Sequence, residues 1–211
     1  MKLDTDSLRR SVQCRMDGAR YAHTLGVEKT AAALGELYLP NKIDELRVAA
    51  LLHDITKSET MQKQLQYVEE FGIMMDDVDP LPPSLYHSVT GAAVVVRDFS
   101  EYATDEVVGA VRWHTTGRRG LTLFELIIYL ADYIEDGREY EDCVTLREYF
   151  WGVDPAKMPE MQRLLHLYET AVLSLDMTIS QLMAKNSCIH GDTVECRNYY
   201  LRLVRDIERR V

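Results

Sequence analysis

The chain has 211 residues, of which 46% are hydrophobic and 27% are charged, a balance that excludes a disordered or fibrous protein. This length suits one well-buried domain. Acidic residues outnumber basic ones by 34 to 24, and the formal net charge of -10 disfavours nucleic acid and anionic lipid surfaces as partners.

The sequence also bears on the cellular compartment. The four cysteines show no C-x-x-C spacing, and the N-terminal string MKLDTDSLRR lacks the apolar core of a secretory signal. The longest apolar segment, Leu121 to Ile134, contains Glu125 and Asp132 and is too short to span a bilayer. We therefore expect a cytoplasmic protein with reduced thiols and no transmembrane helix.

Apolar spacing predicts helices throughout the N-terminal part of the chain. A helix is expected from Thr5 to Cys14, and a longer one from Tyr21 to Leu39, where Pro40 ends it. The stretch from Ile43 to Thr56 predicts the most buried helix, and Glu59 to Phe71 predicts a more polar one.

The middle of the chain continues in the same way. The acidic, proline-rich segment from Asp76 to Pro83 predicts a loop, and Ser84 to Phe99 predicts a helix that carries His87 in its first turn. Thr104 is a suitable N-cap for a helix from Val107 to Trp113, which His114 ends.

Three more helices are expected toward the C-terminus. A capping-box pattern opens Leu123 to Ile134, Pro159 marks the start of a long helix to about Lys185, and a last helix runs from Asp192 through Leu203. No segment alternates like a strand, so the sequence predicts an all-α fold. We expect one domain over residues 1–211, with a core at about 18–140 and C-terminal helices at about 154–211 packed on it.

The segment from Leu46 to Lys57, LRVAALLHDITK, has the spacing of a buried helix but ends in polar residues. His53, Asp54 and Lys57 must be hydrogen-bonded, paired or bound to an ion, because burying them unsatisfied costs on the order of several kcal/mol. Taken alone, this segment fits an exposed polar cluster at a helix end as well as it fits a metal site.

Asp132 raises the same question, because it interrupts the apolar string LIIYLADYI and should face a polar pocket or a cation. Four histidines also lie at the edges of apolar helices, and each alone fits a capping or surface role. Together with two aspartates they could converge inside a helical bundle and form a metal site. Nitrogen and oxygen ligands without thiolate suit Fe, Mn, Co, Ni or Zn. The six residues are His23, His53, Asp54, His87, His114 and Asp132.

Five short strings follow one another along the chain: RYAH at Arg20 to His23, HDITK at His53 to Lys57, LYHSVTGA at Leu85 to Ala92, RWHTTGR at Arg112 to Arg118 and LADYIEDGR at Leu130 to Arg138. In this order they resemble the HD-domain metallophosphohydrolases and, more narrowly, the YqeK family of bacterial symmetrical bis(5'-nucleosyl)-tetraphosphatases. The resemblance extends from about Arg20 to Asn198.

The resemblance implies a single HD-type helical bundle with an iron-type centre held by His23, His53, Asp54 and Asp132. His87 and His114 are implied either to hold a second metal, with Asp54 bridging, or to contact the substrate phosphates. The sequence leaves that choice open.

The resemblance also implies the residues that act on substrate. Lys57 would stabilise charge in the transition state, although a lysine at a helix C-terminus is also favoured by the helix dipole. Arg20 and Arg138 would bind phosphate, although either could be a solvated surface residue. The residues implied to contact substrate are Arg20, Asp54, Ile55, Thr56, Lys57, His87, His114, Thr115, Asp132, Arg138, Thr193 and Asn198, with Asp54, Lys57, His87 and His114 as the catalytic ones.

The expected reaction is metal-dependent hydrolysis of a dinucleoside tetraphosphate, diadenosine tetraphosphate by resemblance, into two nucleoside diphosphates. The alternatives are an HD-type phosphohydrolase acting on a nucleoside monophosphate or a guanosine alarmone, and a regulatory module that binds nucleotide without turnover. The expected partners are a dinucleoside polyphosphate or a nucleoside diphosphate, with a homodimer as an open possibility.

Overall fold

The structure, a computed structural model, describes residues 4–74 and 83–209, and within those ranges the secondary structure is helical with no strand. The predicted all-α fold is therefore confirmed. The α-helices are α1 (Thr5–Gln13), α2 (Gly18–Tyr38), α3 (Ile43–Leu52), α4 (Met61–Glu70), α5 (Pro83–Asp98), α6 (Asp105–Trp113), α7 (Leu123–Ile134), α8 (Glu141–Trp151), α9 (Glu160–Ala184) and α10 (Gly191–Glu208). Short 3-10 turns lie at Pro40–Lys42, Ser100–Tyr102 and Pro155–Lys157.

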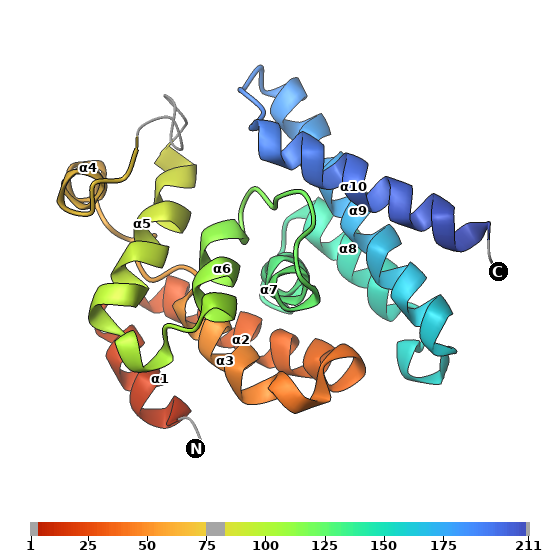
Figure 1. Cartoon of the computed structure of the whole chain (residues 1–211), viewed down its shortest axis with the longest axis horizontal. Helices are drawn as coiled ribbons and strands as arrows, with labels where there is room; N and C mark the ends of the chain where they lie inside the picture. The colour runs from red at the N-terminus through yellow and green to blue at the C-terminus, as the bar shows by residue number, and fades with distance from the viewer. Residues whose placement is uncertain (1–3, 75–82, 210–211) are drawn as a thin grey trace.

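Helix α7 lies at the centre of the molecule, where Figure 1 shows it nearly end-on between the other helices. It packs against α2, α3 and α6 on one side and against α8 and α9 on the other. Its residues Leu126, Ile127, Ile128 and Leu130 are at most 1% exposed, because a helix that is apolar on all sides has to be surrounded. A charged residue on α7 is therefore carried into the interior.

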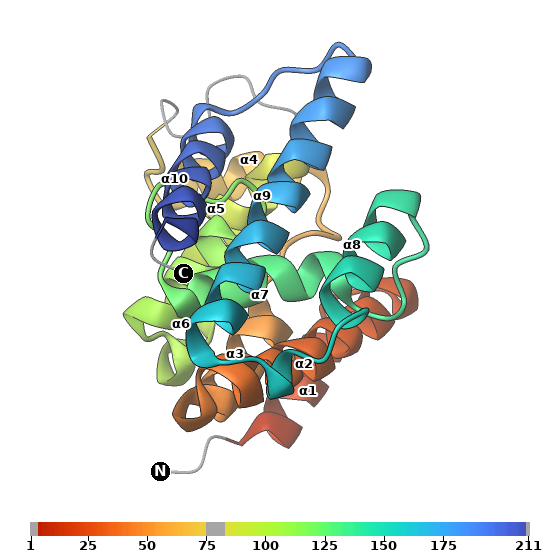
Figure 2. The ribbon, with the colours of Figure 1, turned by 90° about the vertical axis from the view of Figure 1, so that its right-hand side faces the viewer.

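Helices α9 and α10 pack along each other, and Figure 2 shows α9 crossing in front of α7. Helix α8 bridges α7 and α9. The predicted division into a core at 18–140 and C-terminal helices at 154–211 stays a prediction. Among the described residues, no helix combines the length and the apolar character needed to cross a membrane.

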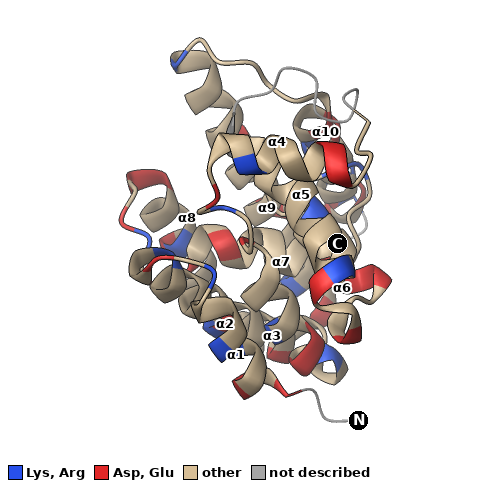
Figure 3. Ribbon diagram, turned by 90° about the vertical axis from the view of Figure 1, so that its left-hand side faces the viewer, with Lys and Arg blue, Asp and Glu red and all other residues tan. Residues whose placement is uncertain are grey.

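Charged residues occupy the outer helices of the bundle. Figure 3 shows lysines, arginines and acidic residues interspersed along α1, α2 and α6, whereas α7 is largely uncharged. Charges of both signs on the surface and an apolar centre are what the composition predicts for a globular protein.

The predicted helix over Ile43–Thr56 is too long at its C-terminus, because α3 ends at Leu52 and residues 53–58 form turns. The ring Nδ1 of His53 lies 2.6 Å from the carbonyl oxygen of Ala50, the oxygen to which the backbone N–H of Asp54 would donate in a continued helix. Lys57 therefore lies in a turn, where its backbone N–H donates to the carbonyl of Asp54 (2.9 Å).

The other predicted helices begin within three residues of their expected starts: α2 begins at Gly18, three residues before the predicted start, and α4 begins at Met61, two residues after it. Thr104 caps α6 and Thr122 forms the capping box of α7, as predicted. Helix α8 was not predicted, and α10 begins one residue earlier than expected, with His190 as its N-cap. The predicted loop at Asp76–Pro83 lies outside the described residues except for Pro83, which opens α5.

Candidate metal centre

Two histidines end two helices in the same way. His53 is the C-cap of α3 and His114 is the C-cap of α6. The Nδ1 of each ring lies within hydrogen-bonding distance of a carbonyl three residues earlier, 2.6 Å from Ala50 for His53 and 2.7 Å from Val111 for His114. Because a carbonyl can only accept, each Nδ1 carries the proton and each Nε2 presents a lone pair.

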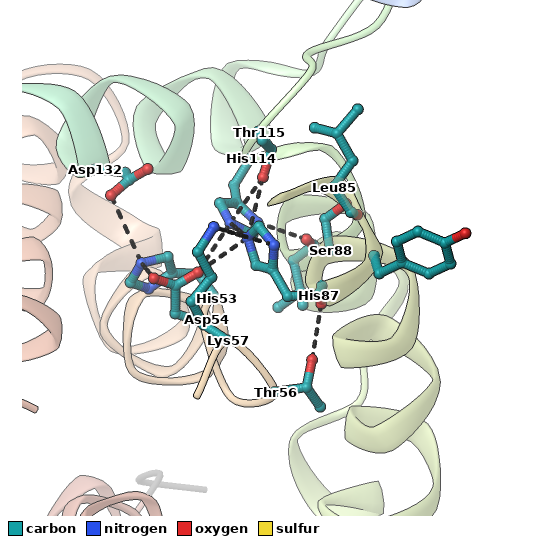
Figure 4. A network of polar contacts seen from close by, with 12 residues as sticks. His53, Asp54, Thr56, Lys57, Leu85, His87, Ser88, His114, Thr115 and Asp132 are labelled. Atoms are coloured by element: carbon teal, nitrogen blue, oxygen red, sulfur yellow. Dashed lines mark hydrogen bonds and ion pairs between the residues drawn. The ribbon is translucent and has the colours of Figure 1, made fainter. Parts of the chain in front are cut away.

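The two lone pairs face Asp54, which follows His53 directly and is 3% exposed (Figure 4). Its Oδ1 lies 3.3 Å from Nε2 of His114 and 3.1 Å from Nε2 of His87, and its Oδ2 lies 3.5 Å from Nε2 of His53. Arg20 on α2 donates to the same Oδ2 from 2.7 Å. Asp54 therefore lies between histidines that belong to three different helices.

A second carboxylate and a further histidine adjoin this group. Asp132 on α7 has its Oδ1 2.9 Å from Nε2 of His23 and 3.7 Å from Nε2 of His53. The other ring nitrogen of His23, Nδ1, lies 3.1 Å from Oε1 of Glu135, a buried carboxylate that also accepts the backbone N–H of Gly137. Glu135 therefore orients the ring of His23 in the same way as the carbonyl of Ala50 orients that of His53, and Nε2 of His23 faces Asp132.

Both aspartates are ionised despite their burial. Burial raises the pKa of Asp54, but its electrostatic interaction with His53 and its contacts with His114, His53 and His87 outweigh burial and hold the pKa well below its usual value. Burial likewise raises the pKa of Asp132, but the charge of Arg138 outweighs it, and the result is again a strongly lowered pKa. Burial lowers the pKa of His87 to about 4, so this imidazole is neutral at pH 7.

The chemistry of these donors fits a divalent cation. Within the described residues, the buried Nε2 atoms of His23 and His53 have no hydrogen-bond partner, although each faces a carboxylate oxygen. Lone pairs facing carboxylates repel unless a cation lies between them. Two sets have ligand atoms within 4.8 Å of one another, and both contain Asp54: one with His23 and His53, the other with His87 and His114.

A buried hydrogen-bond network connects two neighbouring segments of this site, the turn after α3 and helix α5. Thr56 donates to the carbonyl of His87 (3.0 Å), and its hydroxyl lies 3.0 Å from that of Thr90. Gln64 on α4 bonds both the carbonyl of Thr56 and the hydroxyl of Thr90. The turn after α3 is thereby fixed to α5, and His87 is fixed relative to Asp54.

Cationic and hydroxyl groups surround the centre. Lys57 Nζ lies 3.2 Å from Nδ1 of His87, and the hydroxyl of Thr115 lies 3.1 Å from Nε2 of His114. Arg138 bonds both the side chain and, at 2.7 Å, the carbonyl of Asp132. Burial lowers the pKa of Lys57, while the charges of Asp54 and Asp132 act to raise it.

These groups open into a cavity of about 460 Å³, which falls in the range of ~300–1,000 Å³ typical of small-molecule sites. Its far wall comes from α8 and α9. The predicted site residues in its lining are Arg20, Asp54, Lys57, His87, His114, Thr115, Asp132 and Arg138.

Four predicted substrate contacts lie elsewhere. Ile55 is in the hydrophobic core, and Thr56 belongs to the network behind His87. Thr193 is buried in α10, and Asn198 lines a separate small cavity beside Arg119. None of the four lines the cavity at the centre, and their contact with substrate stays a prediction.

Sequence reasoning gave no role to several residues that the structure places here. Glu135 follows Asp132 by three positions, and a carboxylate that directly follows an apolar helix was a signal that could have identified it. Nothing in the sequence singled out Gln64, or the residues Tyr140, Asp142, Cys143, Thr178, Gln181 and Lys185 in the far wall of the cavity.

Residues 20–137 match the sequence model of the HD domain. The chain is 32% identical to the symmetrical bis(5'-nucleosyl)-tetraphosphatase of Bacillus subtilis (strain 168), over 85% of this chain and 88% of that protein. It is also 32% identical to the protein of the same name from Halalkalibacterium halodurans, over 86% and 89% of the two chains.

Similarity also extends to a solved structure. A crystal structure of a predicted HD superfamily hydrolase involved in NAD metabolism, from Clostridium acetobutylicum, superposes with a TM-score of 0.79 at 29% sequence identity. The alignment covers 96% of this chain and 99% of the other, so it includes α9 and α10 as well as the helices that carry the histidines.

Proposed function

The chain belongs to the HD-domain family and, within it, to the symmetrical bis(5'-nucleosyl)-tetraphosphatases, and from this premise we propose that it hydrolyses dinucleoside tetraphosphates. Diadenosine tetraphosphate and water would give two ADP. The observation that carries the proposal is the pair of histidine sets that share Asp54, beside a cavity whose lining contains four cationic side chains.

The metal ligands are part of the proposal. His23, His53, Asp54 and Asp132 would hold one ion, and His87 and His114 would either hold a second ion with Asp54 or contact phosphate. Iron is the ion proposed, with Mn, Co, Ni or Zn as substitutes, because all of them accept mixed imidazole and carboxylate ligands. Bound divalent ions would lower the pKa of water and offset charge on the phosphate oxygens.

The chain's own residues would bind and orient the polyphosphate. Arg20 and Arg138 form ion pairs with Asp54 and Asp132 respectively, so their guanidinium groups have fixed positions in the lining of the cavity. Lys57 would neutralise charge that develops on the phosphate beside His87. The hydroxyl of Thr115, which lies 3.3 Å from Nε2 of His87, would donate to a phosphate oxygen.

His87 and His114 suit proton transfer to the leaving phosphate if they contact it. The Nε2 atoms of the two rings lie 3.0 Å apart, an arrangement in which one proton can be shared between them. The buried position of His87 keeps its resting form neutral.

The names of the relatives favour this reaction over the hydrolysis of a nucleoside monophosphate or a guanosine alarmone, and over binding without turnover. The test is product analysis with the purified full chain, supplied with Mn(II) or with Fe(II) under anaerobic conditions. Diadenosine tetraphosphate should yield ADP alone. Release of ATP and AMP, or no release at all, would contradict the proposed function.

A further inference from the structure

A second cavity lies beside the one at the metal centre and has a volume of about 650 Å³. Three residues line both cavities: Arg20, Arg138 and Tyr140. His23 faces the second cavity, whereas His87 and His114 face the first. The residues of the candidate metal centre therefore stand between two open spaces.

Symmetrical cleavage has a geometric requirement. The bond that breaks belongs to the central anhydride, so a nucleoside with two phosphates extends from each side of the central bridging oxygen, and the attacked phosphorus belongs to one of these halves. If the proposed function is correct, the protein has to accommodate two such halves around one centre. The first cavity, of about 460 Å³, adjoins the centre on the side of His87 and His114, and the second adjoins it on the side of His23.

The charges of the second cavity suit a nucleoside better than phosphate. Beyond the shared arginines, its wall carries Asp17 and Glu139, together with the Glu135 that holds His23. Carboxylates repel phosphate oxygens, but they accept hydrogen bonds from ribose hydroxyls and from the exocyclic amino group of a base.

Tyr140 gives this cavity an aromatic surface. It precedes α8 and is 70% exposed, although it lines both cavities. An exposed ring beside arginines is a suitable stacking partner for a nucleobase.

We propose that the second cavity, bounded by Asp17, Ala19, Glu139 and Tyr140, binds the second nucleoside of the dinucleoside tetraphosphate, with Arg20 and Arg138 contacting the phosphates between the two halves. This proposal rests on the proposed function and adds a binding site to it. With this second site, the two nucleosides of one substrate molecule would lie in chemically different surroundings.

The test compares two substrates that share the same central anhydride. Diadenosine tetraphosphate carries two nucleosides, and adenosine 5'-tetraphosphate carries one. Ala19 is exposed on the first turn of α2 and lines the second cavity but not the first, so Ala19→Trp should fill space in the second cavity without replacing a candidate ligand. The matched control is Glu36→Trp, at an exposed position later on the same helix.

Ala19→Trp should lower kcat/KM for diadenosine tetraphosphate by about tenfold or more and leave that for adenosine 5'-tetraphosphate unchanged. Tyr140→Ala should lower the first value by a similar factor. Glu36→Trp should change neither. An unmodified chain that cleaves the two-nucleoside substrate but not the other would also support the second site.

A binding measurement gives a readout that does not depend on turnover. Calorimetric titration with the β,β'-methylene analogue of diadenosine tetraphosphate, in the presence of Mn(II), should show weaker binding to Ala19→Trp than to the unmodified chain. Titration with ADP, which needs only the first cavity, should give the same affinity for both proteins.

The possible failures can be told apart. An unmodified chain that releases no ADP from either substrate would overturn the proposed function itself. If ADP is released but Ala19→Trp affects both substrates equally, or neither, then only the second nucleoside site is wrong.

Discussion

The two sides of the centre differ in how one imidazole ring is held, because His114 is fixed by the carbonyl of Val111 just as His53 is fixed by that of Ala50, whereas His87 is not fixed in this way. On the side of His23 and His53, each Nδ1 faces an acceptor, the carboxylate of Glu135 or the carbonyl of Ala50. On the other side, both nitrogens of His87 lie near Lys57 Nζ, at 3.2 and 3.3 Å. The first arrangement fixes a lone pair toward the centre before any ligand arrives, whereas the second places a cation beside the ring.

This difference indicates separate tasks for the two sides. Rings whose second nitrogen donates to an acceptor are oriented and made more basic, which strengthens binding of a metal ion. A ring beside an ammonium group lies in surroundings that attract an anion such as phosphate. Asp54 belongs to both sides, because its two oxygens face different rings.

The largest effect is therefore expected from Asp54→Ala, which removes the carboxylate common to both sides. Metal content should fall to background, and hydrolysis should fall by about 10³-fold or more. Elemental analysis and ADP release measure the two losses. Asp206→Ala, at an exposed position on α10, is the matched control and should retain both properties. An Asp54→Ala protein that still cleaved substrate would rule out this site.

Alanine variants of His53 and His87 should distinguish the two sides by their metal content. His53→Ala should remove the ion on the His23 side, whereas His87→Ala should retain it and still lose about 10²- to 10⁴-fold in kcat. Metal content per chain, measured for both variants, checks the difference. Loss of all metal from His87→Ala, with retention in His53→Ala, would reverse the assignment of the two sides.

Glu135→Ala tests whether orientation of His23 matters for binding the ion. Loss of the group that holds Nδ1 should weaken metal affinity by about 10- to 100-fold, with a smaller effect on kcat once metal is saturating. Competition with a chelator measures the affinity. Glu141→Ala, at an exposed position on α8, should bind metal like the unmodified chain, and equal affinity in all three proteins would show that Glu135 has no such role.

The smallest effect is expected from Gly26→Ala. A Cβ at this position of α2 would lie 2.2 Å from Oε2 of Glu135, so the carboxylate has to move. Alanine normally stabilises a helix relative to glycine by about 1 kcal/mol, but here we expect a net destabilisation of ~1–3 kcal/mol and weaker metal binding. Thermal unfolding checks this. Gly18→Ala, which has open space around it, should not be destabilising.

Local sequence patterns determined a large part of this protein. The helical class, the caps at Thr104 and Thr122 and the end of a helix at His114 follow from residue spacing and capping chemistry within a few positions. Asp132 could be predicted to face a polar site because its own helix is apolar throughout.

Only the tertiary structure decided which side chains meet. Glu135 holds His23 across 112 positions of sequence, and Gln64 ties together two segments that precede and follow the undescribed residues. The walls of both cavities come from helices whose crossing angles depend on the packing of the whole core. Helix periodicity is encoded by neighbours a few residues apart, but contacts between distant residues depend on that packing, so the second cavity could not be found from the sequence.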